Sequence, residues 1–79
     1  MNGKFAPENV VQRYAHANRG VESQPEFERA IALKPWRIGR LTAHNWWLYG
    51  VSGGMRIANA RTLAEFLKVT IDDLVTDEK

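Results

Sequence analysis

The 79-residue sequence contains no cysteine, which excludes disulfide bonds, thiolate metal sites and a cysteine nucleophile. It also lacks any apolar run close to the roughly 18 residues that a membrane-spanning helix needs. Its first residues hold no long apolar stretch that would act as a signal peptide. We therefore expect a soluble, cytoplasmic protein that has no membrane partner.

Acidic residues are absent from positions 29–64, whereas the same window contains six Lys and Arg residues and one histidine. The acidic residues lie before and after it. We expect this window to form one positive surface, for which nucleic acid is the preferred partner. The alternative is a solvated basic face without a partner. The cations are Arg29, Lys34, Arg37, Arg40, Arg56 and Arg61.

Residues suited to catalysis or metal binding are also scarce. His16 and His44 fall on separate predicted helices, with no cysteine to complete a metal site. The adjacent Asp72 and Asp73 are explained by their place at the start of a helix. The glycines of 50–54 lack the Lys-Ser or Lys-Thr that follows a phosphate-binding loop. We expect no enzymatic activity, no metal, no cofactor and no small-molecule ligand.

Apolar residues at helical spacing predict an all-α domain of five short helices. Ser23, Thr42 and Thr70 are suited to cap the starts of the second, third and fifth helices, and Gly20 and Gly50 are suited to end the first and third. The predicted helices cover residues 8–17, 24–34, 43–49, 56–67 and 71–75. They lie in one domain of residues 8–76, between a flexible N-terminal tail at 1–7 and a C-terminal tail at 77–79.

Three motifs are Ser-Gln-Pro-Glu-Phe at 23–27, Trp-Leu-Tyr-Gly at 47–50 and Leu-Ala-Glu-Phe-Leu-Lys-Val-Thr-Ile-Asp-Asp-Leu at 63–74. They resemble those of the lambda-repressor/Cro-type helix-turn-helix DNA-binding family. The resemblance covers residues 8–75 and implies a five-helix lambda-repressor-like helix-turn-helix domain whose helix at 42–49 enters a DNA groove. Trp47 follows Gln24 by 23 positions, which is more than the family spacing and implies a lengthened turn between helices two and three.

The resemblance implies that the third helix and its surroundings contact DNA. Asn45 can pair bidentately with adenine, and arginine binds guanine or phosphate. The register of this helix stays open, because aligning Trp47 with the family places His44 inside, whereas a shift by one residue places Ala43 and Trp46 inside. The predicted DNA-binding residues are Gln24, Arg37, Arg40, Thr42, Ala43, His44, Asn45, Ser52 and Arg56.

Trp46 and Trp47 are adjacent, so their side chains leave a helix in directions about 100° apart. We expect one of them in the core and the other at an interface. Stacking of unpaired bases on the exposed ring is the alternative.

Together these features predict a sequence-specific double-stranded DNA-binding transcriptional regulator. By resemblance it is a repressor of phage or mobile-element type that binds a palindromic operator as a homodimer. One alternative is a protein-interaction module, such as an antitoxin or anti-repressor, that uses a Trp-rich surface. Another is a binder of single strands or RNA through its tryptophans. Salt dependence distinguishes DNA binding from a Trp-centred protein interface.

Overall fold

The computed structural model describes residues 5–51 and 56–76, and this part of the chain forms five α-helices and no strand. The all-α class predicted from the sequence is therefore confirmed. None of the helices described is long and apolar enough to cross a membrane. The helices are α1 (Val10–Arg19), α2 (Gln24–Ile31), α3 (Arg40–Tyr49), α4 (Ile57–Leu67) and α5 (Ile71–Thr76).

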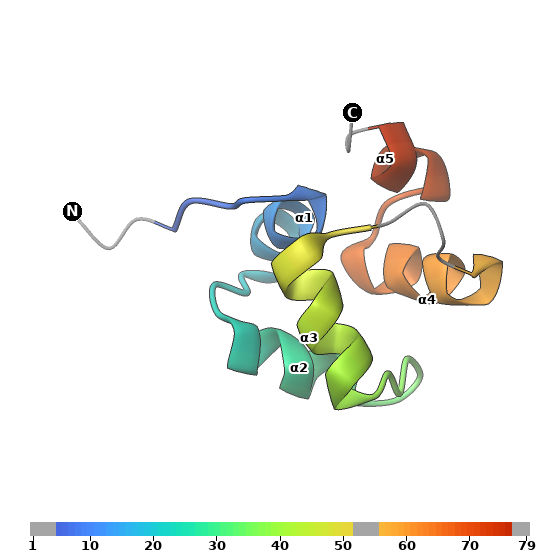
Figure 1. Ribbon diagram of the computed structural model, residues 1–79, viewed down its shortest axis with the longest axis horizontal. Helices are drawn as coiled ribbons and strands as arrows, with labels where there is room; N and C mark the ends of the chain where they lie inside the picture. Colours follow the sequence, from blue (N-terminus) through green and yellow to red (C-terminus); the bar gives the residue numbers. More distant parts are fainter. Residues whose placement is uncertain (1–4, 52–55, 77–79) are drawn as a thin grey trace.

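Helix α1 lies at the centre of the arrangement (Figure 1). Helix α3 packs against both α2 and α1, and α4 packs against both α1 and α5. The chain thus forms two helix pairs, α2 with α3 and α4 with α5, that are joined through α1. Each helix buries one side against the others, as expected for amphipathic helices of a small domain.

Three of the predicted helix boundaries depend on local capping and are confirmed. Ser23 caps α2, because its hydroxyl accepts a hydrogen bond from the backbone N–H of Glu26 at 3.4 Å. Gly20 ends α1 with φ at 70°, in the left-handed region that glycine adopts without strain. At α5, Thr70 and Asp73 exchange bonds between side chain and backbone at 3.1 and 3.2 Å, which forms a capping box.

Two other predicted boundaries, at the end of α2 and the start of α3, are wrong. Helix α2 ends at Ile31, three residues earlier than predicted, and α3 begins at Arg40, with Gly39 in place of Thr42 as its N-cap. The residues between them form a compact turn that has its own hydrogen bonds. The backbone N–H of Ile38 donates to the Ile31 carbonyl at 3.0 Å, which closes the turn against the end of α2.

The turn between α2 and α3, residues 32–39, is anchored to the core by Trp36. The Trp36 ring meets Phe66 of α4 edge-on, with the ring centroids 5.0 Å apart. The guanidinium of Arg19 lies 4.6 Å from the centroid of Trp36 and 4.3 Å from that of Phe66. Its Nε also donates to the Phe66 carbonyl, near the end of α4. The turn is therefore held against α4 and Arg19 of α1 through Trp36.

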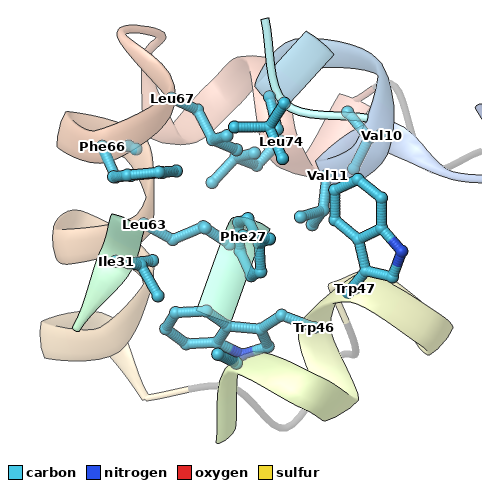
Figure 2. Packing of buried hydrophobic residues seen from close by; sticks show 14 residues of the cluster. Val10, Val11, Phe27, Ile31, Trp46, Trp47, Leu63, Phe66, Leu67 and Leu74 are labelled. Carbon is cyan, nitrogen blue, oxygen red and sulfur yellow. The ribbon is translucent and has the colours of Figure 1, made fainter. Parts of the chain in front are cut away.

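The core is built around Phe27, whose ring is fully buried. Its centroid lies 5.3 Å from that of Trp47 and 5.6 Å from that of Phe66. Both Trp46 and Trp47 are only 6% exposed, so the expectation that only one of them lies in the core is wrong. Figure 2 shows the physical reason, since the Trp46 ring extends toward Ile31 whereas the Trp47 ring turns toward α1. Two neighbouring helices cover the two directions in which the rings leave α3.

Polar side chains of α1 bind backbone carbonyls at the ends of α3 and α4. The last carbonyls of any helix lack partners within the helix. The Trp47 carbonyl accepts bonds from the side-chain amides of Gln12, at 2.6 Å, and Asn9, at 3.0 Å. The Leu67 carbonyl accepts one from Asn18 at 2.7 Å. Because Gln12 is buried, its bond fixes where α3 ends relative to α1.

Part of the predicted N-terminal tail packs against the domain. The Phe5 ring lies 4.9 Å from His16 and 6.0 Å from Trp47, measured between centroids. Phe5 therefore helps to cover the Trp47 ring. The predicted C-terminal tail at 77–79 lies outside the described residues, as do positions 1–4 of the N-terminal tail.

Candidate nucleic-acid interface

Helix α3 has one buried and one exposed face, which settles its register. Ala43, Trp46 and Trp47 are buried, and their spacing places them on one side of a helix. Ala43 has no exposed surface, so the prediction that its side chain contacts a base is corrected, because the core covers it. The opposite side carries Leu41, His44, Asn45, Leu48 and Tyr49, which are exposed or half-buried.

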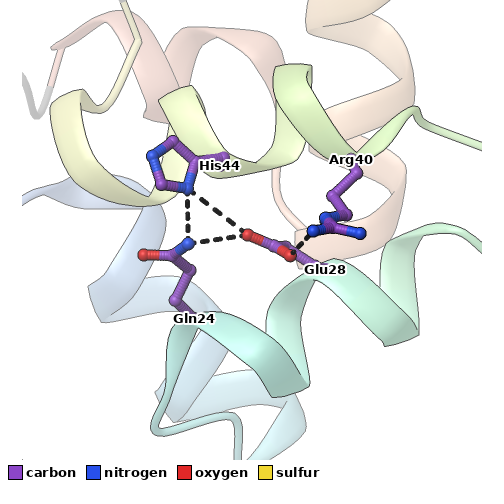
Figure 3. Close-up of polar contacts among 4 residues, drawn as sticks. All are labelled: Gln24, Glu28, Arg40 and His44. Carbon is purple, nitrogen blue, oxygen red and sulfur yellow. Dashed lines mark hydrogen bonds and ion pairs between the residues drawn. The ribbon is translucent and has the colours of Figure 1, made fainter.

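Four polar side chains from α2 and α3 converge beside the exposed face of α3 (Figure 3). We call Gln24, Glu28, Arg40 and His44 the α2–α3 polar cluster. The Gln24 amide nitrogen donates to Glu28 Oε2 at 2.7 Å and also contacts His44 Nδ1. Glu28 Oε2 lies 3.5 Å from His44 Nδ1, and Glu28 Oε1 lies 3.8 Å from Arg40 Nε. Glu28 is thus the common partner of the other three side chains.

The exposure of these side chains differs in a way that bears on binding. The Glu28 side chain is only 16% exposed, whereas His44 is 41% and Arg40 is 88% exposed. Glu28 therefore lies behind its partners, and the cationic and imidazole groups face outward. An ion pair with a side chain as exposed as Arg40 contributes little and is screened by salt, so Arg40 remains available to another anion.

The polar cluster lines an open hollow between the first turns of α2 and α3. Leu41 completes the lining of that hollow. A second hollow adjoins it, because Glu28 and Arg40 line both, and there Arg29 adds a further cation. The surface that these two helices share therefore carries Arg29, Arg40 and His44 around a single recessed carboxylate.

The remaining predicted site residues lie outside this cluster. Arg37 is exposed in the lengthened turn, where its φ is 52°. Thr42 is half-buried within α3 and does not cap it. Arg56 is exposed at the N-cap of α4. Ser52 lies outside the described residues. The structure thus brings together Gln24, Arg40 and His44 from the predicted set, with Asn45 next to them on α3.

Sequence reasoning missed two residues of this surface, Glu28 and Leu41. Glu28 stands just before the acid-free window and four residues after Gln24, a spacing that puts both on one face of a helix. That spacing was the available signal for Glu28. Leu41 is 73% exposed, and no sequence signal distinguishes an exposed leucine from a core leucine at this helix end.

The six cations of the acid-free window are all exposed in the structure: Arg29, Lys34, Arg37, Arg40, Arg56 and Arg61. Over residues 5–51 and 56–76, no group of three or more histidine and carboxylate side chains is arranged to hold a metal ion. No family model matches this chain, and comparisons with curated proteins and with solved structures also found no match. The surface of α2, α3 and the turn between them is therefore the candidate site of function.

Proposed function

We propose that this chain is a sequence-specific double-stranded DNA-binding transcriptional regulator with a helix-turn-helix architecture, in which α3 enters the major groove. The observation that carries the proposal is the division of α3 into a buried face and an exposed face. Ala43, Trp46 and Trp47 fix the helix to the core. The side chains on the opposite face are then held outward by a helix that cannot rotate.

The chemistry of the first two turns of α3 supports contact with base edges. A recognition helix presents its N-terminal residues to the major groove. Here these turns carry Arg40, His44 and Asn45 on the outer side. Arginine matches the acceptors of guanine, asparagine matches the donor and acceptor of adenine, and apolar side chains contact the thymine methyl group. Leu41 and Leu48, which are 73% and 41% exposed, suit the last of these contacts.

The surroundings of α3 support contact with the phosphate backbone. Two exposed cations flank α3 in the sequence. Arg37 lies in the lengthened turn before α3, and Arg56 lies at the start of α4 after it. Gln24, at the start of α2, contacts His44 of α3 and contributes to this surface by positioning that ring. Phosphate contacts of this kind set the orientation of a protein on the duplex, whereas base contacts set its specificity.

The mode of binding follows from the same proposal. Domains of this architecture bind palindromic sites as dimers whose half-sites are separated by about one helical turn, roughly 34 Å. We propose a homodimer on a palindromic operator, and a repressor of the phage or mobile-element type.

In-vitro selection from random duplexes tests this proposal directly. We expect the selection to yield a palindromic consensus, and we expect Asn45→Ala to weaken binding to that consensus by about tenfold, within the range of about 1–3 kcal/mol for a bidentate base contact. Because Asn45 is exposed, the helical content measured by circular dichroism should not change. A selection that returns no consensus, or a variant that binds as tightly as the parent, would refute the assignment of α3.

A protein-interaction module is the second candidate, and one observation favours it. Leu41, Leu48 and Tyr49 are 73%, 41% and 75% exposed on α3, which amounts to an apolar strip beside the polar cluster. Such strips mark protein interfaces as well as sites of apolar base contact. Salt discriminates between the two functions, because DNA binding weakens by about 0.9 log unit per phosphate contact for each log unit of salt, whereas an apolar protein interface does not.

A further inference from the structure

The polar cluster fixes which nitrogen of His44 carries the proton. The Gln24 amide nitrogen donates to Glu28 Oε2 at 2.7 Å, and a carboxylate can only accept, so the orientation of the Gln24 amide is set. The same amide nitrogen contacts His44 Nδ1. An amide nitrogen only donates, so this contact is a hydrogen bond when Nδ1 is the acceptor. In a neutral imidazole the proton then resides on Nε2.

The protonated nitrogen is also the one that faces outward. In Figure 3 the second ring nitrogen of His44 points away from Gln24 and Glu28. The His44 side chain is 41% exposed, so its Nε2–H is available to a ligand. One ring nitrogen contacts the protein and the other points outward. The ring is therefore held in one orientation, and its donor points in one direction.

This donor persists when His44 becomes charged. Glu28 from α2 faces the ring through Oε2, and Arg40 from the same helix as His44 lies by the other oxygen of that carboxylate. Protonation adds a hydrogen to Nδ1, which then faces Glu28 Oε2 at 3.5 Å in place of the bond from Gln24. Nε2 keeps its hydrogen in both states, because both ring nitrogens of a charged imidazole are donors.

We propose that His44 presents Nε2–H as a fixed donor to an acceptor on a base edge, and thereby selects against cytosine at one position of the operator. The inference rests on the proposed DNA-binding function. In the major groove guanine offers N7 and O6, adenine offers N7 and thymine offers O4 as acceptors, whereas cytosine offers only an amino donor. Gln24 and Glu28 are positioning residues in this scheme, since they act through the ring.

A panel of duplexes tests the base preference. Each base pair of the selected operator is replaced in turn, and binding is measured by fluorescence anisotropy. At one position we expect the parent to bind acceptor-bearing bases about three- to tenfold more tightly than cytosine, the size expected for one hydrogen bond. His44→Gln should lose this preference, because glutamine can both donate and accept. His16→Gln is the matched control and should retain it, because His16 lies on α1 and pairs with Glu22.

Three outcomes of this panel overturn the inference. An unchanged preference in His44→Gln means that His44 does not contact the base. A uniform loss of affinity on every duplex, with the preference intact, means that His44 contacts a phosphate oxygen. A preference that is lost in His16→Gln as well means that it does not depend on contact with His44. A parent that binds no selected duplex instead refutes the proposed function itself.

The tautomer can be measured without DNA. Long-range ¹H–¹⁵N NMR spectra distinguish a protonated ring nitrogen from an unprotonated one. In the free parent with neutral imidazole rings, we expect His44 Nε2 to be protonated and Nδ1 to be unprotonated. Gln24→Ala should convert this into a mixture of both tautomers, while the signals of His16 stay unchanged. A parent that already shows the mixture, or shows Nδ1–H, refutes the fixed donor.

Discussion

Arg40 offers the sharpest test of how this surface meets DNA. Its side chain is 88% exposed at the start of α3, and its distance to Glu28 is 3.8 Å. Because that pair is weak in water, Arg40 can leave Glu28 for a phosphate with little loss. We therefore expect Arg40→Gln to remove one phosphate contact and to leave the fold intact.

The magnitude follows from the number of phosphate contacts. If Arg37, Arg40 and Arg56 each contact one phosphate, the logarithm of the binding constant falls with the logarithm of salt at a slope of about −2.7. Between about 50 and about 200 mM salt the parent then loses about 40-fold in affinity. Arg40→Gln should have a slope of about −1.8 and lose about 12-fold over the same range.

The assay is a fluorescence anisotropy titration of one selected duplex at four or more salt concentrations. Arg13→Gln is the matched control, because it removes the same charge from an exposed site on α1, a helix that contributes nothing to the polar cluster. Its slope should equal that of the parent. If the Arg40 variant also keeps the parent slope, Arg40 makes no phosphate contact. The proposed placement of the start of α3 on DNA is then wrong. A parent slope near zero would instead favour the protein-interaction module.

Two further predictions concern stability and use urea unfolding monitored by tryptophan fluorescence. Gly20 and Lys68 end α1 and α4 with φ at 70° and 64°, so Lys68→Gly should raise the free energy of unfolding by about 1 kcal/mol, and Gly20→Ala should lower it by a similar amount. No heavy atom lies within 4 Å of a Cβ placed at Gly20, so the expected cost comes from the backbone conformation alone. A much larger fall in the free energy of unfolding would contradict that explanation. Gln12→Met should cost about 1–2 kcal/mol, because the Trp47 carbonyl keeps only its bond from Asn9; an unchanged midpoint would show that this bond does not hold α3 in place.

The helix ends that the sequence predicts correctly are those that depend on a few neighbouring residues. Ser23, Thr70 and Gly20 act within one helical turn, so the residue type and its immediate neighbours contain the necessary information. Thr42 has the same local character, yet α3 begins before it, at Arg40. The turn closes through a bond between Ile38 and Ile31, and such a contact between two elements has no local sequence signal.

The burial of Trp46 and Trp47 is a second feature that local sequence does not predict, because it depends on packing between helices. The side chains of two adjacent residues leave a helix in directions about 100° apart, so one neighbouring helix does not cover both of them fully. Both are nevertheless buried, since α3 packs against α1 as well as α2. A sequence gives the directions in which side chains leave a helix. How many neighbouring helices cover those side chains depends on the tertiary arrangement.

At the candidate interface, the sequence identifies residue types but not their pairing. Asn45 is predicted from its position at the start of a helix and Arg40 from its position just before that helix, and both are exposed. The partnership of His44 with Gln24 and Glu28 joins residues 20 and 16 positions apart. That pairing decides which ring nitrogen is free, so the hydrogen-bonding character of His44 is a property of the packing of α2 on α3.

These contacts divide the exposed face of α3 into two energetic groups. Asn45 and Leu48 are exposed, so substitutions there should change base preference with little effect elsewhere. His44 and Arg40 share Glu28, and residues with a common partner have non-additive effects. A substitution of His44 or Arg40 changes how Glu28 interacts with the residue that remains. The specificity of this helix should therefore be easier to change by single substitutions at Asn45 and Leu48 than at His44 and Arg40.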